Sequence, residues 1–371
     1  MRIIRIETFA VIVPMQPGTV HSPAYEDSCH QFDWKGKFFA DVPKYIYKVW
    51  ADDGSFGLGE SYREVSEELI QRNIRLLLGQ DPMKMNLRQL PIPPGREYDG
   101  FEVAIYDLVA GKLGVPVYTL LGGACRDRVR VDYWTGRRTP SEAAAIAGMA
   151  KERGFRGLKM KCALEDPNVE RVEEIAARCG PDFEIVLDPN QRFEHPAHAL
   201  RIARRVEKYK VTFEDPVPRW NLDWYRLLRE KTSVPIALHV HLPYAAHGQS
   251  IREMIAAIKL EAVDIFNLGG GLASFVKMAD IADAAGIPVW HGTEVDLGIL
   301  DASYLHACAA APACTLPSDI IGNFLREDDL IAEPLRYDQG FALVPQTPGL
   351  GVTLDEDALA RYTLERRVYP Q

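Results

Sequence analysis

From about residue 129 onward, short apolar segments alternate with longer stretches whose apolar residues recur every three to four positions. The short segments predict buried strands and the longer stretches predict amphipathic helices, a pattern typical of βα units around a parallel sheet. Eight such strands in succession favour a barrel over an open sheet. We predict strands at residues 130–134, 157–162, 184–188, 211–214, 235–239, 262–267, 288–291 and 315–319, with helices at 141–153, 169–178, 196–208, 249–259 and 272–285 between them.

The first part of the chain has a different pattern, a meander of strands at 3–13, 44–50 and 57–60 followed by helices at 66–78 and 101–113. A long polar and aromatic insert, residues 16–37, separates the first two strands. Loops of this length are usually functional or disordered. The insert therefore predicts either a lid that sets substrate choice or a mobile surface loop. Its candidate lid residues are His21, His30, Trp34 and Lys37.

Length and composition narrow the class of protein. A chain of 371 residues is long for one domain, so we expect two, and 47% hydrophobic residues suffice for a large core. The net charge is −9 and no stripe of Lys or Arg is present, which argues against a nucleic-acid partner.

The termini and the cysteines give only negative signals. The sequence has no N-terminal apolar segment typical of a signal peptide and no apolar run of 18 residues, so we expect a cytoplasmic enzyme without membrane contact. None of the six cysteines forms a C-x-x-C pair, and we interpret them as small buried hydrophobic residues rather than a zinc site.

Polar residues stand at or near the ends of seven predicted strands, spaced 25 to 28 residues apart, or one βα unit each. A charge within a buried strand carries a desolvation cost. In a barrel, strand ends converge on one face, where such enzymes keep their chemistry. We therefore predict one shared site, the alternative being that each residue merely begins a solvated loop. The seven residues are Lys161, Asp188, Glu214, His239, Asp264, His291 and Asp319.

Lys159 and Lys161 occupy alternate positions of the second barrel strand and must face the same way. In a barrel strand flanked by apolar residues, that side is the interior. Two neighbouring ammonium groups disfavour each other's charged form, which predicts a lowered pKa for one of them and a usable general base. The alternative is a surface lysine pair on an edge strand.

Asp188 and Glu214 end the next two strands, each shortly before a proline. Two converging carboxylates need a cation, and hard oxygen ligands suit Mg²⁺ with water and substrate oxygens completing the coordination shell. The alternative is that both carboxylates form structural ion pairs with the two lysines.

The ordered motifs Lys159-Met-Lys161, Asp188-Pro-Asn190 and Glu214-Asp-Pro216 resemble those of the enolase superfamily, in particular its mandelate racemase and muconate-lactonizing branches. The segments 120–123 (Leu-Leu-Gly-Gly) and 348–352 (Pro-Gly-Leu-Gly-Val) are also similar to that group. The resemblance covers essentially the whole chain.

This resemblance implies a (β/α)7β TIM-type barrel over residues 126–330. It also implies an α+β capping domain over residues 1–125, completed by the C-terminal segment 331–371. It further implies a half-reaction in which a metal holds the substrate carboxylate, a base takes the α-proton and an enediolate forms. Members of the group suggest a homo-oligomer, either a dimer or an octamer.

The chain departs from the family pattern at the third metal ligand. His239 falls where the muconate-lactonizing branch has a carboxylate, so we predict His239 as the replacement ligand, with His241 as the alternative. An Asp, Glu and His set resembles sites for Mn²⁺, Fe²⁺ or Zn²⁺ more than pure Mg²⁺ sites. The remaining alternative is that neither histidine binds metal.

The opposite face of the substrate also departs from the muconate-lactonizing pattern, because no lysine is available on the sixth strand. Asp264 and His291 match the pair of the racemase branch in type and order, an aspartate orienting a histidine that exchanges a proton. Alternatively, Asn267 faces the interior and Asp264 lies on the helix side.

The sequence thus predicts a metal-dependent lyase or isomerase acting on a small α-substituted carboxylic acid. Lys161 is the predicted base, tuned by Lys159, and His291 with Asp264 works on the other face. The branch resemblance favours dehydration of a hydroxy or sugar acid or racemisation or epimerisation, with cycloisomerisation next. A binding protein that kept the barrel without the chemistry is the second class.

Overall fold

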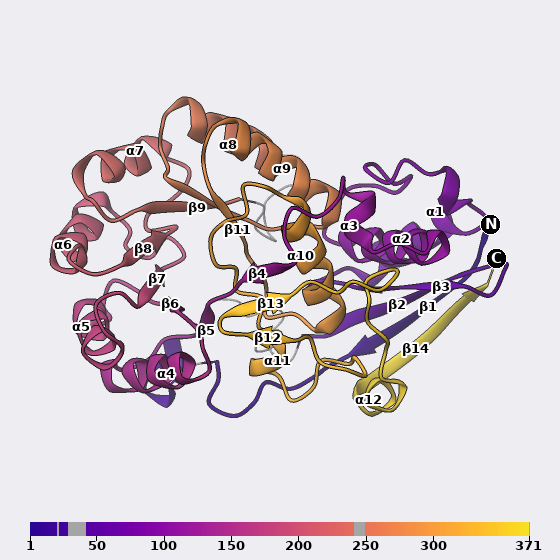
Figure 1. The fold of residues 1–371 in the computed structure, drawn as a ribbon, viewed down its shortest axis with the longest axis horizontal. Helices are drawn as coiled ribbons and strands as arrows, with labels where there is room; N and C mark the ends of the chain where they lie inside the picture. Colours follow the sequence, from indigo (N-terminus) through magenta and orange to yellow (C-terminus); the bar gives the residue numbers. More distant parts are fainter. Residues whose placement is uncertain (21, 29–41, 241–248, 371) are drawn as a thin grey trace.

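An antiparallel sheet forms one end of the molecule, and both chain termini lie at its outer edge (Figure 1). The computed structural model describes residues 1–20, 22–28, 42–240 and 249–370. The C-terminal strand pairs antiparallel with the N-terminal strand, with Arg5 opposite Pro370, so the two ends of the chain belong to one sheet. In sheet order the strands are β14 (Thr363–Pro370), β1 (Ile3–Val11), β2 (Lys44–Ala51) and β3 (Phe56–Glu60).

The helix α2 (Tyr98–Leu113) packs directly on the backbone of β3. Two glycines allow this approach, because a Cβ at Gly57 would lie 2.1 Å from the Ala104 carbonyl oxygen and a Cβ at Gly59 would lie 2.1 Å from that of Gly100. The helices α1 (Glu67–Leu77) and α3 (Val117–Leu120) complete this part of the chain.

Seven parallel strands form the second sheet, in sequential order from β5 to β11. Two isolated parallel bridges, Val289 with Cys314 and Val131 with Ser318, link residues 314–318 to both edges of this sheet, which therefore curls round on itself. This α/β architecture with a curled parallel sheet agrees with the predicted fold class, while the (β/α)7β count and the bounds of the capping domain stay predictions. Its strands are β5 (Tyr133–Thr135), β6 (Gly157–Lys161), β7 (Glu184–Asp188), β8 (Val211–Glu214), β9 (Ile236–Val240), β10 (Ile265–Leu268) and β11 (Val289–His291).

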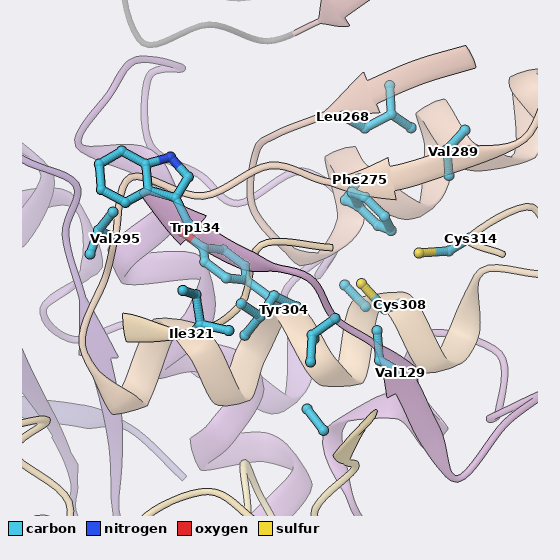
Figure 2. Packing of buried hydrophobic residues seen from close by; sticks show 14 of the residues in the cluster. Val129, Trp134, Leu268, Phe275, Val289, Val295, Tyr304, Cys308, Cys314 and Ile321 are labelled. Carbon is cyan, nitrogen blue, oxygen red and sulfur yellow. The ribbon is translucent and has the colours of Figure 1, made fainter. Parts of the chain in front are cut away.

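Helices follow the strands of this sheet and cover its outside (Figure 1). The core between sheet and helices is apolar, and Figure 2 shows Phe275 of α9 and Tyr304 and Cys308 of α10 near Leu268 and Val289 of the last two strands. The helices are α4 (Pro140–Glu152), α5 (Asn168–Cys179), α6 (Pro196–Val206), α7 (Leu222–Lys231), α8 (Gln249–Lys259), α9 (Leu272–Ala284) and α10 (Gly298–Ala310).

The remaining elements are short. A three-stranded sheet has the order β12-β13-β4. The short elements are β4 (Arg128–Arg130), β12 (Tyr337–Asp338), β13 (Phe341–Leu343), α11 (Gly322–Leu325), α12 (Glu356–Tyr362) and two 3₁₀ turns, η1 (Pro23–Ser28) and η4 (Pro82–Lys84).

In the part of the chain that the structure describes, no helix combines the length and apolar character needed to cross a bilayer.

Residues 22–25 of the predicted lid segment pack against α4, α5 and the loop before α4. The Tyr25 ring lies 4.8 Å from the Arg137 guanidinium and 5.1 Å from that of Arg171, and the Ser22 hydroxyl donates to Glu142 over 2.9 Å. The four candidate lid residues and His241 lie outside the described residues. The lid therefore stays a prediction.

A buried ion cluster joins the two parts of the molecule. Lys44 of β2 forms ion pairs with Glu60 of β3 and, over 2.5 Å, with Asp296 in the loop after β11. The Glu60 carboxylate also accepts hydrogen bonds from the backbone N–H groups of Leu297 and Leu300, both 2.9 Å, at the start of α10. All three charged side chains are at most 3% exposed.

We predict that Lys44→Ala destabilises the protein, because it leaves Glu60 and Asp296 buried without their cation. Loss of one partner of a buried ion pair costs about 3–5 kcal/mol. Urea unfolding followed by tryptophan fluorescence measures the change. Lys112→Ala, which removes the exposed partner of Asp53, is the control and should leave the unfolding free energy essentially unchanged. Equal values for both variants would contradict the proposed importance of the cluster.

Buried His306 makes stability depend on pH. Its Nδ1 accepts from the Tyr118 backbone N–H over 3.3 Å and its Nε2 lies 3.1 Å from the Leu350 carbonyl oxygen, which fits a neutral ring. Burial lowers the pKa of His306 to about 4. Since an unfolded histidine titrates near 6.5, the unfolded state binds the proton first as the pH falls. Stability contributed by the neutral ring is therefore lost between about pH 6.5 and pH 4.

We expect His306→Gln to reduce this acid sensitivity by about 1.4 kcal/mol per pH unit, the slope for one proton. Urea unfolding of the wild type and the variant at pH 7 and pH 5 gives the comparison. Identical slopes in the two proteins would show that His306 does not titrate in this way.

Candidate active site

The strand register directs the two lysines and the two carboxylates into the interior of the curled sheet. Lys161 pairs with Asp188, and Lys159 pairs with Val186, which pairs in turn with Thr212, two residues before Glu214. Paired residues of adjacent strands share a face, and residues two apart on one strand do so as well. All four side chains therefore lie on one face at the carboxyl-terminal ends of β6, β7 and β8.

The Lys159 ammonium group lies among three carboxylates. Its Nζ is 2.8 Å from Glu214 Oε2, 3.4 Å from Asp319 Oδ2 and 3.5 Å from Asp188 Oδ2. Lys159, Asp188 and Glu214 are all buried. Asp319 belongs to the predicted series of strand ends, although no individual role is predicted for it. The structure brings it into the same cluster.

Lys161 contacts the same oxygen of Asp188 as Lys159 and is more accessible than Lys159. Its Nζ lies 2.5 Å from Asp188 Oδ2 and donates to Asn190 Oδ1 over 2.9 Å. The Lys161 side chain is 29% exposed, against 6% for Lys159. Of the two lysines, Lys161 is the one that a molecule entering the site can reach.

The backbone takes a left-handed conformation just beyond β7 and β8. Asn190 has a φ of 44° and Asp215 a φ of 43°, values that asparagine and aspartate tolerate better than most residues. The Asn190 N–H donates to Asp188 Oδ1 over 3.1 Å, and buried Asp215 accepts from the His239 N–H over 2.9 Å. These turns hold the carboxylates and His239 in place.

The charges in this cluster shift one another's pKa values. Burial and the nearby Asp188 raise the pKa of Glu214 to about 8. Burial alone would lower the pKa of Lys159, but Asp319, Glu214 and Asp188 raise it above its usual value. The expectation that the lysine pair lowers the pKa of one member is therefore wrong for Lys159, because three carboxylates outweigh one neighbouring ammonium group.

His239, the predicted third metal ligand, also faces the interior, two residues after Ala237, which pairs with Glu214. Its Nδ1 lies 3.5 Å from Glu214 Oε1. Burial, then Lys159 and Arg219, lower the pKa of His239 well below its usual value, so the imidazole is neutral. A neutral imidazole is the form that binds metal ions.

The donor types around Glu214 are those of a divalent-metal site. Asp188 and Glu214 supply buried carboxylate oxygens, and His239 supplies a neutral nitrogen. Glu214 Oε2 lies near Lys159 but accepts no hydrogen bond from the residues that the structure describes. Among the described residues, however, no three His, Cys, Asp or Glu side chains are arranged to hold a metal ion. The ligand types fit a metal, but the predicted triad is not an assembled site, and Lys159 is the cation between its two carboxylates.

The predicted Asp264–His291 pair is wrong. Asp264 lies just before the start of β10, at the amino-terminal end of the sheet, where it pairs with Arg229 over 2.7 Å and accepts from the Ile236 N–H over 2.9 Å. The buried His291 ring stacks between Phe275 of α9 and Tyr304 of α10, with ring centroids 4.4 Å and 4.1 Å away. It packs in the helix layer, outside the strands.

The inward residues of β10 and β11 are Asn267 and Trp290, since His239 pairs with Asn267 and Asn267 with Trp290. Asn267 is the residue that the alternative prediction places in the interior instead of Asp264. Its Nδ2 donates to Glu214 Oε1 over 2.7 Å. Gly292 makes room for it, because a Cβ there would lie 2.4 Å from Asn267 Oδ1. Residues two apart on a strand face the same side, so Trp290 shares the inward face with Gly292. Alternation along the sequence could therefore have identified Trp290 as an inward residue as well.

Known proteins resemble this chain over most of its length. Residues 141–358 match the family described as enolase C-terminal domain-like. The chain is 28% identical to the N-succinyl-L-Arg/Lys racemase of Bacillus cereus, over 88% of this chain and 92% of that protein. The crystal structure of that racemase superposes with a TM-score of 0.85 at 25% identity and covers both chains fully.

Two further relatives are named for other reactions. Muconate cycloisomerase 1 of Rhodococcus opacus is 31% identical over 71% of this chain and 70% of its own length. The D-xylonate dehydratase of Haloferax volcanii is 29% identical over 88% of this chain and 86% of its own length.

We predict that His291→Phe leaves proton exchange on a carboxylic-acid substrate within about tenfold of the wild type. The reason is that the ring packs between Phe275 and Tyr304. Removal of a general acid or base would instead cost about 10²–10⁴-fold. Deuterium incorporation from deuterated solvent, followed by NMR, gives the rate. A loss in the larger range would restore His291 as a catalytic residue.

Proposed function

The chain belongs to the enolase C-terminal domain-like family of the enolase superfamily, and we propose that it is a lyase or isomerase that removes the α-proton of a small carboxylic acid. The observation that carries the proposal is the cluster of Lys159, Lys161, Asp188 and Glu214 at the carboxyl-terminal ends of adjacent strands. Relatives named racemase, cycloisomerase and dehydratase agree with enediolate chemistry of this kind.

Lys161 is the proposed base, because it is the more accessible lysine and Asn190 and Asp188 fix its ammonium position. Lys159 stays protonated, because neighbouring carboxylates raise its pKa, and its positive charge favours the negative charge that develops on the substrate as the proton leaves. The two lysines thus divide the work: Lys161 moves the proton and Lys159 stabilises charge.

Asp188, Glu214 and His239 would hold a divalent metal, Mg²⁺ or, given the nitrogen donor, Mn²⁺ or a related ion. Such a metal supplies Lewis-acid stabilisation of the substrate carboxylate. Asn267 contributes by fixing the orientation of Glu214. We also propose that the protein forms a homo-oligomer, either a dimer or an octamer.

The residues facing Lys161 across the interior favour a reaction completed from one side of the substrate. The inward positions of β10 and β11 carry Asn267 and Trp290, whose side chains do not exchange protons near neutral pH. Lys161 can take the α-proton and return it to a β-hydroxyl leaving on the same side. We therefore favour dehydration of a hydroxy or sugar acid.

Racemisation or epimerisation is the second candidate, favoured by the similarity to a racemase over 88% of this chain. Cycloisomerisation has the support of the relative that is 31% identical. Mass spectrometry distinguishes both reactions from dehydration, because their products keep the mass of the substrate and the product of dehydration has lost one water.

We expect Lys161→Met to reduce α-proton exchange by about 10²–10⁴-fold, the range for loss of a general base. The assay screens hydroxy acids, sugar acids and N-acylated amino acids in deuterated solvent, with NMR for exchange and mass spectrometry for loss of water. Lys210→Met, at an exposed lysine paired with Asp182, is the matched control and should keep the wild-type rate. Exchange that survives in Lys161→Met would refute the assignment of the base.

Metal removal provides a separate test. We expect metal analysis of the purified protein to find about one divalent ion per chain, and chelation to abolish exchange until metal is restored. His239→Ala should weaken metal binding, measured by titration calorimetry, because it removes one of three donors. Unchanged affinity in His239→Ala would refute only the ligand assignment, whereas full activity after chelation would refute the metal-dependent reaction.

A further inference from the structure

A cavity of about 610 Å³ lies between α2 of the N-terminal part and α9 of the parallel-sheet part. None of its lining residues belongs to a strand of the parallel sheet, so it is separate from the lysine and carboxylate cluster. The proposed reaction uses none of these residues.

Two carboxylates, Asp99 and Glu102 of α2, form the inner wall of this cavity and are only 2% and 1% exposed. Glu102 Oε1 accepts from the Ala273 N–H over 3.4 Å, in the first turn of α9. The two acids converge at the same point, because a Cβ on Gly271 would lie 2.2 Å from Glu102 Oε2 and 2.9 Å from Asp99 Oδ1.

The second oxygen of Glu102 has no hydrogen-bond partner within the described ranges. A buried polar atom without a partner is costly, and most such atoms in native proteins are satisfied by protein, water or a ligand. Burial and the neighbouring Asp99 raise the pKa of Glu102 well above its usual value. A bound cation that donated hydrogen bonds to this pair would relieve both the repulsion and the missing bond.

The exposed charged side chains that line the cavity are of both signs. Arg88 and Lys277 are cations, and Asp280 is a carboxylate. Apolar and aromatic side chains also line the cavity, among them Leu90, Tyr106 and Val276. The cavity therefore combines two buried acids, apolar side chains and an exposed rim that carries two cations and one carboxylate.

We propose that this cavity binds a small zwitterion of the amino-acid class. Its ammonium group would donate to Glu102 and Asp99, its carboxylate would pair with Arg88 and Lys277, and an aliphatic or aromatic side chain would pack on the walls. Charge-assisted hydrogen bonds at both ends fix the orientation and exclude molecules that lack either charge.

Titration calorimetry with L-leucine, L-methionine and L-phenylalanine as probes tests the proposal. We expect at least one to bind the wild type, and its affinity to fall about tenfold or more when the amine is acetylated or the carboxylate is converted to an amide. Absence of binding by all three amino acids, or equal affinity for the blocked analogues, would overturn the proposal.

Variants locate the binding. Glu102→Gln keeps an acceptor for the Ala273 N–H but removes the charge, and Lys277→Ala changes only an exposed rim side chain. Both substitutions should lower the affinity for the amino acid about tenfold. Lys231→Ala, at an exposed lysine outside the cavity, should have no effect. Unchanged affinity in Lys277→Ala would overturn the proposal even if Glu102→Gln fails to fold.

Lys161→Met separates this site from the proposed active site. Amino-acid binding should survive in that variant, because Lys161 does not line the cavity. Loss of binding there would place the amino acid in the active site and refute the second site, while leaving the proposed reaction intact.

Discussion

The clustering of five charged side chains, four of them buried, at one end of the curled sheet is the constraint on which the rest of the site depends. Two lysines face three carboxylates, Asp188, Glu214 and Asp319, so the fully ionised cluster carries one net negative charge. Such a cluster would repel a carboxylate substrate. One divalent cation would reverse its sign, which gives a physical reason for a metal here beyond the family resemblance.

The fold meets this constraint through strand alternation. Because each strand side chain points opposite to its neighbour, a shift of one residue exchanges the barrel interior for the helix layer. Lys159 and Lys161 lie in phase with Asp188 and Glu214, and the register continues through His239 to Asn267 and Trp290. His291 is one residue out of this phase and stacks between Phe275 and Tyr304.

The sequence was sufficient where the strand signal was strong. The strands predicted at 184–188 and 211–214 have the observed bounds, so the carboxylates at their ends were correctly placed in the interior. It was insufficient at the sixth strand, predicted at 262–267. That strand begins only at Ile265, so Asp264 belongs to the amino-terminal end, where Arg229 binds it. Nor could the sequence foresee that Asp319 would help to raise the pKa of Lys159, since this depends on closure of the sheet.

The central claim is that Asp188 and Glu214 exchange the Lys159 ammonium for a divalent metal. Anomalous diffraction from crystals grown with millimolar Mn²⁺ tests it most directly. The account predicts a manganese peak between these two carboxylates, with Lys159 displaced from its position among them. Absence of a peak there, with Lys159 still bound to Glu214, would contradict it.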